Sequence, residues 1–280
     1  MKKILLPTDF SDNAWNALFT ALKLHTDLEC HFYLLNAHEP NFAKLLGDKG
    51  KQRLAVIYDS MEAYSQQELD KVLAYLKQYH KNPKHTFEKI SRTDDLVPAT
   101  NEMILKKDID IIIMGTKGAT GAKEVLMGSN TAKVIKSVRN RPIIAVPDAH
   151  NFQKLERIVF PTDFTKTFEP FELKALKELA LLWKSEVLIF QVGQEFLMND
   201  AQISNRERLI KELGSVKHSF HQTEFKTSVT DAIGDFVKEK EADMIALIHY
   251  RHTFMEKLMG EPVIKKVAFH TQVPLLVLPE

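Results

Sequence analysis

Apolar and polar positions follow two periods along the chain, and their alternation predicts strands and helices in turn. Short apolar runs predict strands near residues 2–8, 30–37, 84–91, 109–115 and 142–146. Apolar residues at helical spacing predict helices near 12–26, 54–80, 94–107 and 129–140. In the longest of these, Leu69, Val72 and Leu76 fall on one face. The alternation is typical of an α/β fold, with a parallel sheet covered by helices on both faces.

One segment shows neither period. From Asn41 to Arg53, a stretch that includes Gly47 and Gly50, apolar residues follow no helical or strand spacing. We expect an ordinary surface loop there, and a flap over a binding site is the alternative.

The pattern returns in the second half, with a second helix near 199–213. Ile4-Leu5-Leu6-Pro7-Thr8-Asp9-Phe10-Ser11 recurs as Ile158-Val159-Phe160-Pro161-Thr162-Asp163-Phe164-Thr165. Arg141-Pro142-Ile143-Ile144-Ala145-Val146-Pro147 recurs as Val273-Pro274-Leu275-Leu276-Val277-Leu278-Pro279. Two domain-sized copies indicate a tandem duplication rather than a solenoid. We predict domains over residues 1–148 and 154–280, joined by a polar stretch.

Composition narrows the class of protein. A chain of 280 residues accommodates two domains of ordinary size, and a net charge of +1 gives no field that attracts nucleic acid or an acidic membrane. Cys30 is the single cysteine, so no internal disulfide can form. No apolar run is long enough to span a bilayer, and the first residues lack a signal-peptide pattern. We therefore expect a cytoplasmic protein with neither a nucleic-acid nor a membrane partner.

Candidate chemistry gathers in a glycine-rich segment. Four of the ten glycines, Gly115, Gly118, Gly121 and Gly128, fall between the strand at 109–115 and the helix at 129–140. Glycine allows backbone N–H groups to crowd against a ligand, and the start of a helix favours an anion. The segment predicts a phosphate cradle.

These residues resemble the universal stress protein family, in the form of a tandem two-domain member. Gly115-x2-Gly118-x9-Gly128-Ser129 fits the family's nucleotide signature, and the repeated Pro-Thr-Asp-Phe segments and closing strands are also similar to it. The resemblance implies, in each half, a five-stranded parallel open sheet of order 3-2-1-4-5, adenine nucleotide alpha hydrolase-like. Ligands of such sheets bind where the winding reverses, between the first and fourth strands.

The resemblance also implies how the two copies pair. Single-domain members pair through their last strands, and here Ile143–Val146 and Leu275–Leu278 are both apolar. We expect them to pair antiparallel within the chain as a pseudo-dimer, since a bare apolar edge is sticky. Further pairing as a homodimer stays open.

For the first half we predict an adenine-nucleotide site that holds ATP, with or without Mg²⁺. Asp9 is expected to bind the ribose or the adenine, by resemblance, and helix capping is its alternative. Backbone groups after the fourth strand and at the helix start are expected to bind phosphate, and Ser129 to add a hydroxyl or cap the helix. Thr8, Ala37 and Met114 would form the adenine wall, bordered by His38. The candidate set is Pro7, Thr8, Asp9, Ala37, His38, Met114, Gly115, Lys117, Gly118, Gly128, Ser129, Asn130 and Thr131.

The second half lacks the signature. Where Gly115 and Gly118 would recur, the chain has Ile248-His249-Tyr250-Arg251-His252, and Gly260 is followed by Glu261 and Pro262. A carboxylate at that helix start would repel phosphate, so we predict no ATP there, although Thr162 and Asp163 remain. The pairs His249/His252 and His218/His221 have metal-ligand spacing, but ordinary hydrogen-bonded histidines are the expectation. Another ligand of His249, Arg251 and His252 stays open.

No catalytic motif accompanies the site. The chain has neither a P-loop, nor a dinucleotide fingerprint, nor a nucleophile elbow. We therefore expect a nucleotide-binding protein of stress response or signalling that is not an enzyme and acts on an unknown protein partner. A weak ATPase or phosphotransferase, and a nucleotide-independent interaction module, are the alternatives.

Overall fold

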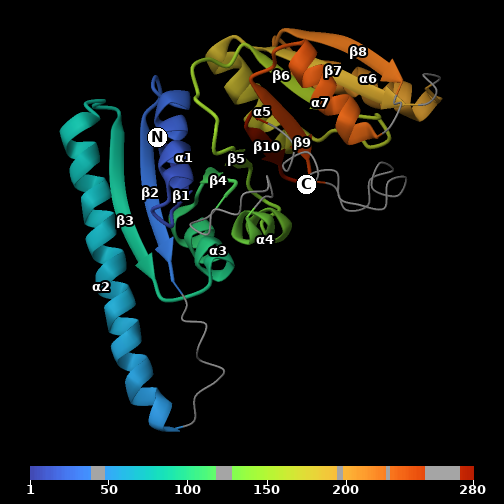
Figure 1. Cartoon of the computed structure of the whole chain (residues 1–280). Helices are drawn as coiled ribbons and strands as arrows, with labels where there is room; N and C mark the ends of the chain where they lie inside the picture. The colour runs from blue at the N-terminus through green and yellow to red at the C-terminus, as the bar shows by residue number, and fades with distance from the viewer. Residues whose placement is uncertain (39–47, 118–127, 194–197, 225–227, 250–271) are drawn as a thin grey trace. The chain divides into compact units, whose positions relative to one another are not determined.

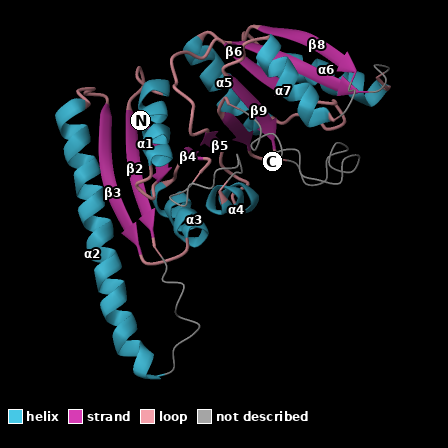
Figure 2. Ribbon diagram, viewed as in Figure 1, coloured by secondary structure: helices cyan, strands magenta, loops and turns pink. Residues whose placement is uncertain are grey.

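The computed structural model describes residues 1–38, 48–117, 128–193, 198–224, 228–249 and 272–280. These residues form two compact units, the first ending at Val138 and the second beginning at Arg139. Each unit is an α/β structure of strands and covering helices (Figures 1 and 2).

The first unit is built on four parallel strands. They are β1 (Lys2–Pro7), β2 (Cys30–Ala37), β3 (His85–Arg92) and β4 (Ile111–Gly115), in the order β3-β2-β1-β4. β1 pairs with β2 on one side and with β4 on the other, with Ile4 opposite Ile111. Ile4, Leu5, Ile112 and Ile113 are fully buried, because both faces of this sheet are covered.

Four helices of the first unit lie against this sheet. They are α1 (Asp12–Leu24), α2 (Asp48–Tyr79), α3 (Leu96–Lys107) and α4 (Ser129–Ser137). Right-handed crossovers place α1 and α2 on one face and α3 and α4 on the other. Trp15 of α1 packs edge-on against Tyr75 of α2, with ring centroids 5.2 Å apart.

One sequence expectation is wrong for α2. The segment from Asn41 to Arg53 was expected to form a loop, but α2 begins at Asp48 and continues for 32 residues. Figure 1 shows it running past the arrowheads of β2 and β3, beyond the carboxyl edge of the sheet. The helical period was missed because residues 48–53 carry few apolar side chains; residues 39–47 lie outside the described residues.

The second unit shows the complete predicted strand order. Its strands are β5 (Ile143–Val146), β6 (Arg157–Pro161), β7 (Glu186–Gly193), β8 (His218–Glu224), β9 (Met244–Ile248) and β10 (Leu275–Leu278). The order β8-β7-β6-β9-β10 is 3-2-1-4-5 in the numbering of this half, and the first unit shows the first four places of that order. The covering helices are α5 (Pro170–Trp183), α6 (Asp200–Leu213) and α7 (Val229–Glu239). The predicted α/β fold is confirmed.

β5 is encoded by the first half of the sequence but pairs with β10 in the second unit. The two strands are antiparallel, with Ile144 opposite Leu276, and both side chains are fully buried. This is the predicted pairing of the two last strands. Because of this pairing, β5 belongs to the second compact unit, whereas the sequence repeat puts the first domain's limit at 148.

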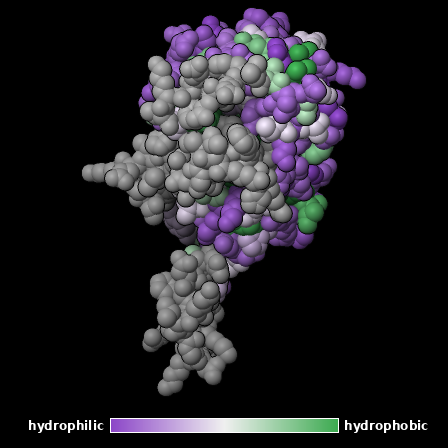
Figure 3. Space-filling model, turned by 90° about the vertical axis from the view of Figure 1, so that its right-hand side faces the viewer, coloured by the Kyte–Doolittle hydropathy of each residue, from purple (hydrophilic) through white to green (hydrophobic). Residues whose placement is uncertain are grey.

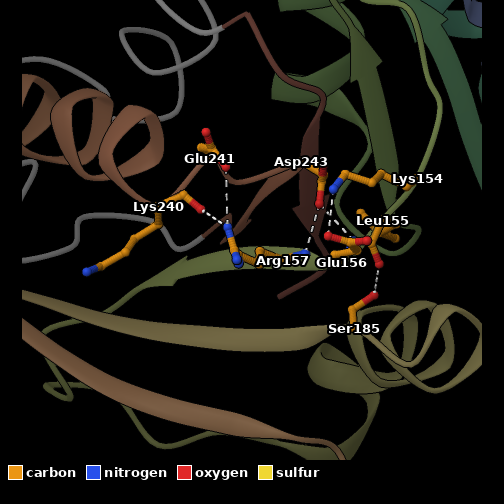
Figure 4. Close-up of polar contacts among 8 residues, drawn as sticks. All are labelled: Lys154, Leu155, Glu156, Arg157, Ser185, Lys240, Glu241 and Asp243. Atoms are coloured by element: carbon orange, nitrogen blue, oxygen red, sulfur yellow. Dashed lines mark hydrogen bonds and ion pairs between the residues drawn. The ribbon is translucent and has the colours of Figure 1, made fainter.

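The duplication is visible in hydrogen bonds at the amino ends of the sheets. In the first unit, the Lys3 N–H donates to Asp110 Oδ2 at 2.8 Å and the Asp110 N–H to the Lys3 carbonyl at 2.9 Å. In the second unit, Arg157 and Asp243 exchange the same two bonds, each 2.9 Å (Figure 4). The aspartate that precedes the fourth strand therefore sets the register of the first strand in both copies.

The segment before β6 belongs to the core of the second unit. Phe152 is 2% exposed and packs edge-on against Trp183, with centroids 5.2 Å apart. Figure 4 shows Ser185 donating its hydroxyl to the Leu155 carbonyl and Lys154 paired with Glu156. This stretch therefore anchors the start of the second copy instead of forming a free linker.

Figure 3 shows one face of the described surface. On the face drawn in Figure 3, purple hydrophilic residues dominate, with small green hydrophobic groups among them. None of the helices in the described part of the chain is long and apolar enough to cross a membrane.

Candidate functional site

A pocket opens at the carboxyl ends of β1 and β4, which are neighbours in the first unit's sheet. Its volume is about 330 Å³, within the range of small-molecule sites. It is lined by Pro7, Thr8, Asp9, Ala14, Ala37, Leu96, Met114, Gly115, Lys117, Gly128, Ser129, Asn130 and Thr131. The structure thus brings together eleven of the thirteen predicted residues, whose contacts with a ligand stay predictions.

A tight turn places Asp9 at the pocket. Asp9 Oδ1 accepts hydrogen bonds from the Ser11 N–H at 3.1 Å and the Ser11 hydroxyl at 2.6 Å. Thr8 Oγ1 accepts from the Phe10 N–H at 3.0 Å, and Phe10 adopts a left-handed φ of 64°. The N-cap of α1 is Ser11, whose side chain accepts from the Ala14 N–H. The capping alternative for Asp9 is therefore wrong, and its carboxylate is held by the turn at an exposed position.

Gly115 is required for a reason that the sequence does not reveal. It was expected to make room for phosphate, but it has no positive φ, and a Cβ there would lie 2.5 Å from Oδ1 of Asn13. Asn13 is on the first turn of α1 and is 3% exposed. A side chain at position 115 would therefore collide first with this buried amide.

Hydrogen bonds join the two ends of the glycine segment. The Lys117 N–H donates to Asn13 Oδ1 at 2.7 Å, and the Gly128 N–H donates to the Thr116 carbonyl at 2.5 Å. The Thr131 hydroxyl donates to the Gly115 carbonyl at 2.7 Å. The Thr131 hydroxyl therefore fastens α4 to the end of β4, and binding of phosphate by the start of α4 stays a prediction. Gly118 lies outside the described residues.

The start of α4 faces the pocket. Its N-cap is Gly128, with φ −54° and ψ 145°, so Ser129 is the first helical residue and not the cap. Ser129 and Asn130 are exposed and line the pocket. The N–H groups of a first helical turn lack partners within the helix, and the helix dipole is positive there. The start of α4 is therefore a favourable position for binding an anion.

His38 does not line the pocket, contrary to the expectation that it borders an adenine. Its Nε2 lies 3.3 Å from Glu62 Oε2 of α2 and 3.3 Å from the Thr93 hydroxyl, and its side chain is 9% exposed. Burial opposes ionisation of Glu62, but hydrogen bonds from Gln66 and Ser91 and the nearby His38 outweigh it and lower the pKa of the carboxyl. Glu62 and Thr93 therefore hold the His38 ring, which is not among the residues that line the pocket.

Two lining residues were missed, and each had a signal. Ala14 follows the repeated Thr-Asp-Phe segment by one helical turn. Leu96 begins α3 directly after its N-cap Asp95, whose side chain accepts from the Leu96 N–H at 2.8 Å. Helix starts that follow parallel strands lie at the carboxyl edge, where ligands bind.

The second unit repeats the turn but covers it. Thr162, Asp163 and Thr165 make the same hydrogen bonds as their counterparts. Here, however, α6 contributes side chains to the turn: Gln202 Nε2 donates to the Asp163 carbonyl at 2.8 Å and Asn205 Nδ2 to the Phe164 carbonyl at 2.9 Å. The His249 N–H donates to the Leu278 carbonyl; Arg251, His252, Gly260, Glu261 and Pro262 lie outside the described residues.

The paired histidines of β8 have local partners. His218 Nδ1 lies 2.9 Å from the Val216 carbonyl, and His221 Nε2 lies 2.9 Å from the Ser219 hydroxyl. Within the described ranges, no group of three or more His, Cys, Asp or Glu residues could hold a metal ion.

Comparison with known proteins identifies the family. A family model described as the universal stress protein family matches residues 1–147, more than half of the chain. The chain belongs to this family.

Its relatives include two proteins of Methanocaldococcus jannaschii. Universal stress protein MJ0577 is 33% identical over 161 residues, which cover 52% of this chain and 94% of that protein. Universal stress protein MJ0531 is 28% identical over 147 residues, 52% of this chain and 81% of that protein. The crystal structure of a universal stress protein from Archaeoglobus fulgidus covers 99% of this chain and 96% of its own, with a TM-score of 0.65 and 18% identity. That match supports the tandem fold across both halves.

Proposed function

We propose that the first unit binds ATP in this pocket and that the protein acts in stress response or signalling. One observation supports this most: the turn after β1, the end of β4 and the start of α4 converge on a single pocket. A nucleotide has an apolar base, a hydroxyl-rich sugar and an anionic tail. The pocket offers partners for each, since Ala37 and Met114 are apolar, Asp9 is a hydrogen-bond acceptor, and α4 presents a positive helix end.

We propose binding without turnover. The lining residues that the structure describes include no histidine or cysteine, and the Asp9 carboxylate is engaged by Ser11. The hydroxyl of Thr131 and the N–H of Lys117 are used to shape the segment. These groups position a ligand; they are not arranged as a nucleophile and base.

We propose further that the second unit does not bind ATP in this way. Its turn is held by Gln202 and Asn205 of α6, so the carbonyls of Asp163 and Phe164 are already engaged. The lost glycines and the acidic Glu261 in the sequence point the same way. This half then serves as a scaffold or as a surface for a protein partner.

Matched substitutions in the two turns test the proposal. Calorimetric titration of the full chain with ATP is expected to give one site per chain. Asp9→Ala should weaken binding about tenfold, because a hydrogen bond to a charged group is worth roughly 1.5–3 kcal/mol. Asp163→Ala, which removes the same turn bonds in the second unit, should leave affinity and stoichiometry unchanged.

Two outcomes contradict it: two tightly bound ATP per chain, or no binding heat with or without Mg²⁺. The enzyme alternative is decided by measuring phosphate released from ATP, with Asp9→Ala as the control for a contaminating ATPase. At ATP concentrations below the dissociation constant, release that falls in this variant as much as its ATP affinity would establish catalysis.

A further inference from the structure

We propose that Asn13 of α1 is a positioning residue that sets the conformation of residues 115–117, where the proposed phosphate-binding segment begins, and that makes Gly115 obligatory. The inference rests on the proposed function for its link to phosphate, but its structural part stands apart from any ligand. Asn13 belongs to no motif in the sequence, and it does not line the pocket.

Asn13 Oδ1 lies close to both Lys117 and Gly115. Asn13 Oδ1 accepts the Lys117 N–H at 2.7 Å and lies 2.5 Å from the position of a Cβ on Gly115, with Asn13 Cγ at 2.7 Å from the same position. Real Cβ contacts are not this short, so the amide can approach the end of β4 only because residue 115 has no side chain. Gly115 and Asn13 therefore depend on each other.

The bond from the Lys117 N–H to Asn13 holds one end of the glycine segment, residues 115–117. The other end is held by the Thr131 hydroxyl on the Gly115 carbonyl and by the Gly128 N–H on the Thr116 carbonyl. Asn13 therefore ties residues 115–117 to α1, while Thr131 ties them to α4. Since α1 also begins directly after the Asp9 turn, Asn13 connects the proposed nucleoside end of the pocket to the proposed phosphate end.

The burial of Asn13 makes the bond costly to remove. Asn13 is 3% exposed and Lys117 is half-buried, so removing the acceptor costs the hydrogen bond and also part of the desolvation penalty of the Lys117 N–H. In Asn13→Ala, residues 115–117 should therefore move or become mobile. Binding of the anionic tail should suffer, while the nucleoside contacts at Thr8 and Ala37 remain.

The first test compares affinities for ATP and adenosine in the full chain. Asn13→Ala should lower ATP affinity about tenfold and leave adenosine affinity within about twofold. Asp12→Ala is the control: it removes an exposed acidic side chain from the first turn of the same helix, so any general weakening of α1 should appear there too. Equal losses for ATP and adenosine would overturn the proposal.

A double-mutant cycle tests the coupling to Gly115. Gly115→Ala alone should weaken ATP binding, because its Cβ collides with the Asn13 amide. In Asn13→Ala/Gly115→Ala the two shortest contacts, with the amide Oδ1 and Cγ, are gone and the next is the carbonyl of residue 13 at 3.0 Å, so the second substitution should add less than it costs alone. Additive losses would show that Gly115 is needed for another reason.

Hydrogen exchange separates this inference from the proposed function. The Lys117 amide should exchange slowly in the wild type, at least tenfold faster in Asn13→Ala, and slowly again in Asn13→Asp, which keeps an acceptor oxygen. This result is expected even if the wild type binds no ATP. Unchanged Lys117 exchange in Asn13→Ala would refute the role of Asn13 whatever the ligand.

Discussion

The two Thr-Asp-Phe turns of this chain are nearly identical in local geometry and differ in what lies over them. Phe10 and Phe164 adopt left-handed φ values of 64° and 56°, and in both turns the preceding threonine and aspartate accept the same backbone hydrogens. In the first unit the turn borders a pocket. In the second, α6 side chains bind its carbonyls and Phe164 is 1% exposed. A local motif thus specifies a turn, and the neighbouring helix decides its use.

The largest expected difference lies in the two phenylalanines. Phe164→Ala should destabilise the second unit by about 3–5 kcal/mol, as for a buried ring, whereas Phe10→Ala should cost roughly 1 kcal/mol because Phe10 is half-buried beside Tyr64. The backbone strain is the same at both sites, so the difference reports packing. Urea unfolding measures it, with Trp15 reporting the first unit and Trp183 the second. Equal losses would mean that the two turns are equally packed.

Lowering the pH should destabilise the first unit more than the second, by less than the difference between the two phenylalanine substitutions. Burial, reinforced by Lys2, lowers the pKa of His25 to about 3, and burial also lowers the pKa values of His80 and His85. Below a pH of about 6.5 the unfolded histidines gain protons that the folded ones refuse, so stability falls as pH falls. For His25 alone the loss from pH 7 to 5.5 is on the order of 1 kcal/mol.

Urea unfolding at each pH, reported by Trp15 and Trp183, compares the stabilities of the two units. In the second unit, burial lowers the pKa of His221. Since the first unit has three such histidines among the described residues, the second unit should lose less stability between pH 7 and 5.5. His25→Gln should flatten the pH dependence reported by Trp15 and leave that reported by Trp183 unchanged. A dependence that stays the same in His25→Gln would assign the acid sensitivity to other groups.

The smallest effect is expected when an α6 side chain that binds the turn of the second unit is removed. Asn205→Ala should cost about 1 kcal/mol in the transition of Trp183, because the Phe164 carbonyl loses a donor. ATP affinity should not change, since the proposed site is in the other unit. Glu207→Ala, an exposed position on the same helix, is the control. A gain of a second ATP site in Asn205→Ala would show that α6 alone closes this half.

Sequence reasoning succeeded where the physics is local. Apolar runs predicted β1 to β5, and the repeat predicted the same order of elements in the second half, because strand burial and duplication are both visible along the chain. The pairing of β5 with β10 was implied by the family resemblance, and the structure confirms it. It failed where partners are distant. His38 is directed by Glu62, 24 positions away, and Gly115 is constrained by Asn13, 102 positions away. The beginning of α2 was missed because its first turns carry no apolar stripe to detect.

The antiparallel pairing of β5 with β10 has a consequence for taking the molecule apart. A fragment that starts at residue 154 lacks β5, so one edge of its terminal strand is stripped of hydrogen-bonding partners along Leu275–Val277. Such an edge recruits whatever strand comes near, including the same strand of another fragment. Gene duplication has in this way left the later copy reliant on a short piece of chain that the earlier copy encodes.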